Sequence, residues 1–226
     1  VIPDQLYAEP QAKESQRIQG VGQFKSVLKL PEVWLLAMVI FTAYILYIGT
    51  YDLPAFAEKG YGRTKTFGAT LGTIRDWMRP IAALGAGLLA DKFRASRTVG
   101  AAFLLLIVTF GSLFLLNPSE VSIGIFWIQV IVAGLAAFAL RGIYFAMLEE
   151  IGIPYHLTGI TVGIVSFIGF MPDVFAHLLS GWFVDNFDGL LGYHYYFGFL
   201  ALVASVGLVA SLVTLLRSVK LKNYNG

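Results

Sequence analysis

Cysteine is absent from this 226-residue chain, and charged residues make up only 13% of it. Without cysteine there is no disulfide framework and no thiolate metal site. Soluble domains carry charge on about a quarter of their residues, whereas 57% of this chain is hydrophobic and its mean hydropathy is +0.73. This composition predicts an integral membrane protein. The net charge of +2, with its bases spread among loops, offers no patch for nucleic acid.

Enzyme motifs are missing as well. The chain has no Gly-x-Ser-x-Gly motif of an intramembrane serine protease and no Walker-type loop with its Lys-Ser/Thr pair. Ser180 lies near His177 in the sequence, but no third partner or oxyanion site accompanies these two residues. We therefore expect no enzymatic activity, no metal and no cofactor.

Six apolar segments are each close to the roughly 20 residues that cross a hydrocarbon core of ~30 Å. They predict membrane-spanning helices at residues 33–53, 66–91, 98–116, 121–147, 157–183 and 194–216. Helix breakers fall in the expected loops, at Pro54, Pro118, Pro154 and the Asp188-Gly189 turn. Backbone groups in hydrocarbon must be paired within their own segment, so the fold class is an all-α membrane protein.

The polar segments predict the domain organisation. Residues 1–30 are expected to form a cytoplasmic linker that ends in a short amphipathic helix suited to the headgroup layer, and a disordered lead-in is the alternative. A six-helix domain at 31–217 and a cytoplasmic tail at 218–226 follow. With the amino terminus inside, ten Lys and Arg residues face the cytoplasm against three outside, which favours both termini there. The chain starts with Val and shows no signal-peptide layout, so we expect a piece of a longer protein.

A shift of 94 residues relates the ends of the second and fifth spans, because it superposes Gly87 on Gly181 and Asp91 on Asp185. Three helices separate the two copies, and an odd number of crossings places them on opposite sides of the membrane. The chain is therefore expected to contain two three-helix units related by an axis in the membrane plane, an inverted repeat found in secondary transporters.

The stretch Gly87–Arg97 reads G-L-L-A-D-K-F-R-A-S-R. It resembles the signature loop of the major facilitator superfamily, usually written G-x-x-x-D-R/K-x-G-R-R/K. The chain departs from that loop at Ala95 and Ser96, where the family often has Gly and Arg. This weakening suits the second signature loop of a twelve-helix member, and the run Leu140–Pro154 resembles a bacterial, largely uncharacterised branch of the family.

The resemblance implies a C-terminal six-helix half with an inverted 3+3 repeat, in a bacterial inner membrane. Its partners are then an N-terminal six-helix half, the lipid bilayer and a small solute moved by alternating access. The loop is expected to latch one conformation, and for its bases the positive-inside bias is the alternative. The expected gating and signature-loop residues are Gly87, Asp91, Lys92, Arg94, Arg97, Arg141, Glu149, Glu150 and Asp185.

Charged residues inside the second span are candidates for function, since a charge at mid-bilayer costs about 3 kcal/mol on insertion scales. Arg75 and Arg79 are spaced i, i+4 on one helix face, and Asp76 lies between them. Arg79 is about 18 Å from Asp91 by helical rise, near the midplane. Two uses remain open: the arginines clamp an oxyanion, or Asp76 neutralises Arg79 in a structural or gating network.

The fifth span places Asp173 at a matching depth, 12 residues before Asp185, with His177 one turn further on. Asp173 is a candidate for substrate contact, for proton coupling or for structural pairing. His177 and Asp76 are further proton-coupling candidates, and for His177 packing is the alternative.

Tyrosines recur along the first span. Tyr44 and Tyr47 are candidates to present hydroxyl groups to a substrate, and aromatic packing is the alternative. For Arg141 we expect snorkelling or pairing with Glu149 or Glu150. Asp52, at the outer edge of the span, is expected to be solvated.

Together these features predict secondary active transport of a small organic anion, with proton coupling open. The expected substrate-binding residues are Arg75, Arg79, Asp173, Tyr44 and Tyr47. The alternative is a six-helix channel, or a non-transporting binding module, that acts as an oligomer.

Overall fold

The computed structural model describes residues 22–224, with side chains described for residues 22–219. Every regular element in this part of the chain is a helix, beginning with residues 22–28. The remaining elements are α2 (Pro31–Gly49), η1 (Thr50–Asp52), α3 (Leu53–Gly60), α4 (Lys65–Phe93), α5 (Ala95–Leu115), α6 (Ile123–Ile143), η2 (Tyr144–Ala146), α7 (Met147–Glu150), η3 (Tyr155–Leu157), α8 (Thr158–Gly169), α9 (Pro172–Asn186) and α10 (Leu191–Tyr224). The first 21 residues of the predicted linker lie outside the described residues.

Five helical stretches within residues 22–224 are long and apolar enough to cross a membrane, one fewer than the six expected. They are Pro31–Gly60, Ala95–Leu115, Ile123–Glu150, Tyr155–Asn186 and Leu191–Val219. The predicted second span forms α4, a 29-residue helix. Composition does not mark it as a span, because Arg75, Asp76 and Arg79 place three charges within five residues of its middle.

The first span extends further than predicted, since the chain remains helical to Gly60. Pro54 was expected in a loop but lies in the first turn of α3, where its missing N–H removes no helical hydrogen bond. The 3₁₀ turn η1 joins α2 to α3 and carries Tyr51 and Asp52. A 3₁₀ segment within a longer helix often marks a hinge or a functional position.

The predicted span at 157–183 lies within the candidate span Tyr155–Asn186, but it is not one continuous helix. It is divided into α8, which ends at Gly169, and α9, which starts at Pro172. Proline has no N–H to continue the helical ladder. Gly169 also packs directly against Ile40 of α2, where a side chain would clash. By contrast, α4 continues through Pro80.

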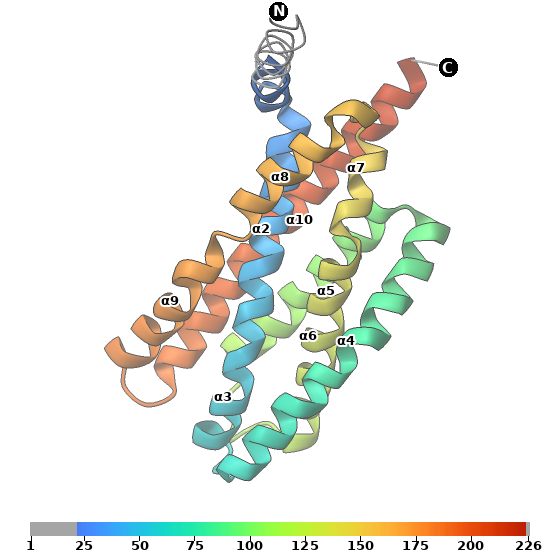
Figure 1. Cartoon of the computed structure of the whole chain (residues 1–226). Helices are drawn as coiled ribbons and strands as arrows, with labels where there is room; N and C mark the ends of the chain where they lie inside the picture. Colours follow the sequence, from blue (N-terminus) through green and yellow to red (C-terminus); the bar gives the residue numbers. More distant parts are fainter. Residues whose placement is uncertain (1–21, 225–226) are drawn as a thin grey trace, which may run out of the picture.

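Aromatic packing holds the interior of the bundle together. The Phe56 ring lies 5.1–5.9 Å from the rings of Phe126, Tyr193, His194 and Phe197, within the range for favourable aromatic pairs. These contacts fix α3 against α6 and α10. At the other end of the bundle, Arg217 of α10 donates to Glu32 of α2 at 3.0 Å, so the start of α2 and the end of α10 lie together (Figure 1).

Glycines of α6 allow α4 to approach closely. Gly134 faces Arg75, and a Cβ added at Gly142 would lie 3.2 Å from the Cα of Ala83. Small residues on one face of a helix let helix backbones pack tightly in membranes. Gly134 and Gly142 are eight residues apart on one face of α6, and Phe138 lies between them on the same face. α4 lies at the outside of the bundle beside α6 (Figure 1), so this contact places the charged middle of α4 against the polar end of α6.

Candidate anion-binding site

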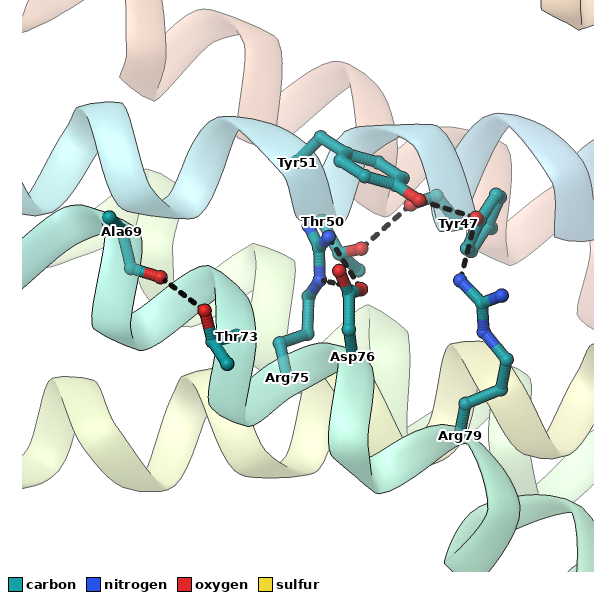
Figure 2. Close-up of polar contacts among 8 residues, drawn as sticks. All are labelled: Tyr47, Thr50, Tyr51, Ala69, Thr73, Arg75, Asp76 and Arg79. Atoms are coloured by element: carbon teal, nitrogen blue, oxygen red, sulfur yellow. Dashed lines mark hydrogen bonds and ion pairs between the residues drawn. The ribbon is translucent and has the colours of Figure 1, made fainter.

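The site is built on a row of tyrosines along α2 and η1. The ring centres of Tyr44 and Tyr47 are 5.7 Å apart, and those of Tyr47 and Tyr51 are 5.3 Å apart. The hydroxyl groups of Tyr47 and Tyr51 hydrogen-bond to each other. Tyr47 is buried between its neighbours, and the ring of Phe138 packs on it at 5.8 Å. The row therefore combines aromatic packing with hydroxyl groups that point toward α4 (Figure 2).

Arg75 is only 2% exposed despite its charge. Its Nε and Nη2 donate to Oδ1 of Asp76 at 3.2 and 2.8 Å. Its Cζ lies 3.8 Å from the centre of the Tyr51 ring, a favourable cation–π position. The charge of Arg75 is thus compensated by the adjacent carboxylate and by the ring (Figure 2).

Arg79 lies one turn further along α4 and is exposed. Its Nη2 donates to the hydroxyl oxygen of Tyr47 at 3.4 Å, and its Cζ is 5.2 Å from the centre of the Phe138 ring. Figure 2 shows the resulting row, which runs from Asp76 and Arg75 through Tyr51 and Tyr47 to Arg79. Asp76 therefore neutralises Arg75 and not Arg79, because its carboxylate points to the residue beside it.

Arg141 of α6 also lies over the Tyr47 ring. Its Cζ lies 4.1 Å from the centre of the Tyr47 ring and 5.1 Å from that of Tyr44. The pairing expected with Glu149 or Glu150 is not made. The two ion pairs among the described side chains are Arg75–Asp76 and Arg217–Glu32, so neither Arg79 nor Arg141 has a carboxylate within 4.0 Å.

Arg79 and Arg141 line one cavity of about 200 Å³, together with Ala83, Phe138 and Gly142. Since a water molecule in the liquid takes about 30 Å³, this volume corresponds to about seven waters. Two guanidinium groups around one small cavity, with no carboxylate partner in the described part of the chain, form an electropositive pocket. Planar N–H donors of this kind match carboxylate, sulfonate and phosphate oxygens.

The other predicted substrate and coupling residues lie at the edge of this arrangement. Asp173, in the first turn of α9, is exposed and near Tyr44. Tyr44 itself packs on Phe170, with ring centres 5.1 Å apart. His177 is exposed, and its ring centre is 6.3 Å from that of Tyr51. The structure thus brings Asp173 and His177 to the tyrosine row, but not into contact with Arg79.

The predicted signature loop lies at the far end of α4 from these tyrosines. A second cavity, of about 320 Å³, is lined there by Asp91, Arg94, Glu149 and Glu150 among others. The Glu150 carboxylate accepts from the backbone N–H of Ser96 at 3.2 Å, which caps the start of α5. Arg94 adopts φ 76°, a conformation uncommon for a residue other than glycine.

The remaining residues of the loop and of its repeat are largely solvent-facing. Lys92 and Arg97 are exposed, and Gly87 is half-buried with no neighbouring atom within 4 Å of where a Cβ would lie. Asp185 is exposed near the end of α9. Among the described residues, neither Asp91 nor Asp185 has an ion-pair partner within 4.0 Å.

One buried acid was missed. Asp52, expected to be solvated, is half-buried, and its Oδ1 accepts from the Ser180 hydroxyl at 2.7 Å. Two signals pointed to this position. Pro54 two residues later restarts the helix and keeps Asp52 inside the bundle, and Ser180 is a polar residue within an apolar span.

Comparisons with known proteins give two similar curated proteins. The chain is 29% identical over 196 residues to the inner membrane protein YihN of Escherichia coli strain K12, covering 85% of the chain and 46% of that protein. It is 29% identical over 188 residues to the inner membrane protein YqcE of the same organism, covering 80% and 43%. The chain thus spans about half the length of the curated relatives it matches. With its apolar helices, this supports an integral inner membrane protein.

The comparisons correct the assignment to the major facilitator superfamily. No family model matches the chain, and the two relatives are named as inner membrane proteins and not as members of that superfamily. The assignment depended on about a dozen residues in Gly87–Arg97. A glycine, an acid and several bases at the end of an apolar helix also arise from close helix packing and the positive-inside bias, so the pattern was not specific enough.

Proposed function

We propose that this chain forms part of a secondary transporter that moves a small organic anion across the inner membrane by alternating access. The observation that carries the proposal is the meeting of Arg79 and Arg141 at Tyr47, with no carboxylate of residues 22–219 within 4.0 Å, around a cavity of about 200 Å³. In an apolar bundle each such charge costs about 3 kcal/mol on insertion scales. An anion bound between the two guanidinium groups offsets that cost.

The geometry favours Arg79 and Arg141 over Arg75 as the binding pair. The Arg75 guanidinium is buried against Asp76 and Tyr51, so binding an anion would require breaking an existing ion pair. Arg79 and Arg141 hold only aromatic and hydroxyl contacts. In this proposal Tyr47 orients both guanidinium groups, and Tyr44 borders the site.

The proposal includes α4 as a sixth crossing, with both termini in the cytoplasm. At 29 residues and about 1.5 Å per residue, α4 is about 43 Å long, which exceeds a ~30 Å hydrocarbon core. Its charged middle is compatible with a membrane span where it lines a polar cavity and not lipid. The first and the last helix of the described chain begin and end, respectively, at the same end of the bundle (Figure 1). An even number of crossings requires this arrangement.

A second membrane-embedded half is expected to complete the site. The relatives extend well beyond the aligned region, which covers 46% and 43% of their lengths. Small or polar side chains recur at three- and four-residue spacing along one face of α4. Such a face suits close packing by another helix or a water-filled cavity. These residues are Ala69, Gly72, Thr73, Asp76, Pro80 and Gly87.

The test is uptake by proteoliposomes that contain the full-length protein in which this chain lies. The probes are radiolabelled glycerol 3-phosphate, lactate and isethionate, which differ in their anionic group, with glycerol as the neutral probe. Wild type is expected to take up at least one anion and to exclude glycerol. Arg79→Gln and Arg141→Gln are each expected to reduce that uptake strongly.

Arg63→Gln is the matched control. Arg63 also lies over an aromatic ring, that of Phe67 at 5.6 Å, but in an exposed loop away from the cavity. Uptake by this variant is expected to equal wild type. Equal uptake by Arg79→Gln and wild type would refute the anion site, and transport of glycerol alone would refute the substrate class.

A further inference from the structure

A second polar cluster lies within the apolar bundle, where η1 meets α9 and α10. It consists of Asp52 in η1, Ser180 in α9 and Tyr196 in α10. Ser180 and Tyr196 are 3% and 1% exposed. Neither the anion site nor the helix packing accounts for a carboxyl group at this position, because an apolar side chain would fill the space at lower cost.

The hydrogen bonds of this cluster are incomplete. Oδ1 of Asp52 accepts from the Ser180 hydroxyl at 2.7 Å. Oδ2 of Asp52 and the hydroxyl oxygen of Tyr196 are both buried and have no hydrogen-bond partner in the described part of the chain. An ionised carboxylate in this position has an unsatisfied oxygen in an apolar environment, which is costly. A protonated carboxyl group carries a donor at that oxygen and no net charge.

The charged and titratable groups around Asp52 come from three elements. α9 contributes His177 beside Ser180, α10 contributes Tyr193 and Tyr196, and α4 contributes Arg75. Arg75 is the permanent charge in this set, and it is already paired with Asp76. Its Nη1 is nevertheless buried without a partner. A negative charge at Asp52 therefore competes with Asp76 for the same guanidinium group.

We propose that Asp52 is the proton-binding site that couples proton movement to anion transport. One proton from the outer solution adds to Oδ2 and forms an O–H bond, and a small movement of the two side chains then lets this O–H donate to the Tyr196 hydroxyl oxygen. Loss of that proton to the other side restores the carboxylate, to which the Tyr196 O–H then donates. The coupling part of this inference rests on the proposed function.

The neighbouring residue links this cluster to the anion site. Tyr51 follows Thr50 in the same 3₁₀ turn, its ring lies under Arg75, and its hydroxyl group contacts that of Tyr47. Tyr47 in turn holds Arg79. A carboxylate at Asp52 draws Arg75 away from Tyr51, so the protonation state of Asp52 changes the contacts that position Arg79.

The first experiment measures proton binding without transport. Infrared difference spectra of the purified full-length protein are recorded as the pH is changed, for wild type and for Asp52→Asn. The asparagine keeps the size of the side chain and an oxygen for Ser180, so the fold is retained. Wild type is expected to show a carboxylic C=O band that appears on acidification in an apolar environment and is missing from Asp52→Asn. An identical band in both would overturn the assignment of the proton to Asp52.

The second experiment measures coupling in proteoliposomes. A gradient of one pH unit supports up to about tenfold accumulation of anion per coupled proton. One pH unit is a tenfold ratio of proton concentration, which has the same free energy as a tenfold ratio of anion concentration. Asp52→Asn is expected to lose this accumulation but to keep exchange of labelled for unlabelled anion. Asp188→Asn, which changes an exposed acid just beyond the end of α9, is expected to retain both.

Three outcomes would overturn the coupling proposal: gradient-driven accumulation in Asp52→Asn, accumulation that follows a sodium gradient and not a proton gradient, or no anion movement by wild type. The last would refute the proposed function as well. In that case the infrared band still decides whether Asp52 binds a proton, so the two failures are distinguishable.

Discussion

Replacing Arg141 with glutamine is expected to weaken anion binding and to leave the fold as stable as before, or more stable. A charge-assisted hydrogen bond contributes about 1.5–3 kcal/mol. Loss of one such contact therefore weakens affinity by about 10- to 150-fold, since 1.4 kcal/mol is a factor of ten. The substitution leaves Tyr47 and Arg79 in contact, so it removes one guanidinium group and not the whole site.

The effect on stability comes from two opposing contributions. Arg141 lies 4.1 Å from the Tyr47 ring centre and 5.1 Å from that of Tyr44, and loss of these two cation–π contacts together costs about 1–2 kcal/mol. Removing a charge that has no carboxylate partner within 4.0 Å among the described side chains recovers up to about 3 kcal/mol on insertion scales. This gain offsets the first effect or exceeds it, so the thermal midpoint in the absence of ligand is expected to stay or rise.

The assay is equilibrium binding of labelled glycerol 3-phosphate to the purified full-length protein, with thermal unfolding measured on the same samples. Arg63→Gln is again the control and is expected to change neither quantity. Affinity within twofold of wild type, or a fall in the thermal midpoint, would show that Arg141 serves packing and not anion binding.

Three further substitutions test the packing around the site. Gly142→Ala is expected to push α4 away from α6 at a cost of about 1–3 kcal/mol and to reduce anion affinity, whereas Gly111→Ala, where no atom lies within 4 Å of an added Cβ, is expected to be neutral or stabilising by thermal unfolding. Tyr47→Phe removes the hydroxyl group that joins two neighbours and should weaken binding about fivefold, because a hydrogen bond is worth about 1 kcal/mol. Asp76→Asn leaves the charge of buried Arg75 unpaired and is expected to lower the thermal midpoint in the apo protein; an unchanged midpoint would mean that the half-exposed carboxylate contributes nothing.

Local sequence signals predicted the parts of the site that lie on one helix. The apolar pattern placed the second span at 66–91, close to α4 at Lys65–Phe93, and the spacing of the tyrosines placed them on one face of α2. The charges on α4 were identified as candidates. Which of them Asp76 neutralises depends on side-chain direction, and the structure pairs it with Arg75.

The rest of the site depends on contacts between segments far apart in the chain. Arg141 was expected near Glu149 because these residues are close in sequence, but the glycines of α6 bring it beside Tyr47 of α2. Asp52 was expected to be solvated because it lies at the outer edge of the first predicted span, and its burial became visible only with Ser180 in place 128 residues away. Hydrophobic periodicity predicts which face of a helix is buried, but it does not predict which other helix packs against that face.

The resemblance to a transporter family carried the sequence interpretation beyond what its loop supported. The loop Gly87–Arg97 lies beside the cavity lined by Asp91, Arg94 and Glu150, where it positions the start of α5. The candidate anion site is at another place in the bundle and does not depend on that loop. The transport proposal therefore rests on Arg79, Arg141 and Tyr47 alone.

The most direct test of that proposal is counterflow. Proteoliposomes with the full-length protein are loaded with unlabelled glycerol 3-phosphate and diluted into a trace of labelled glycerol 3-phosphate, with no ion gradient. A carrier with alternating access is expected to accumulate label transiently above its outside concentration, and Arg79→Gln is expected not to. Label that only equilibrates in wild type would indicate a channel and contradict alternating access, and accumulation that survives Arg79→Gln would contradict the anion site.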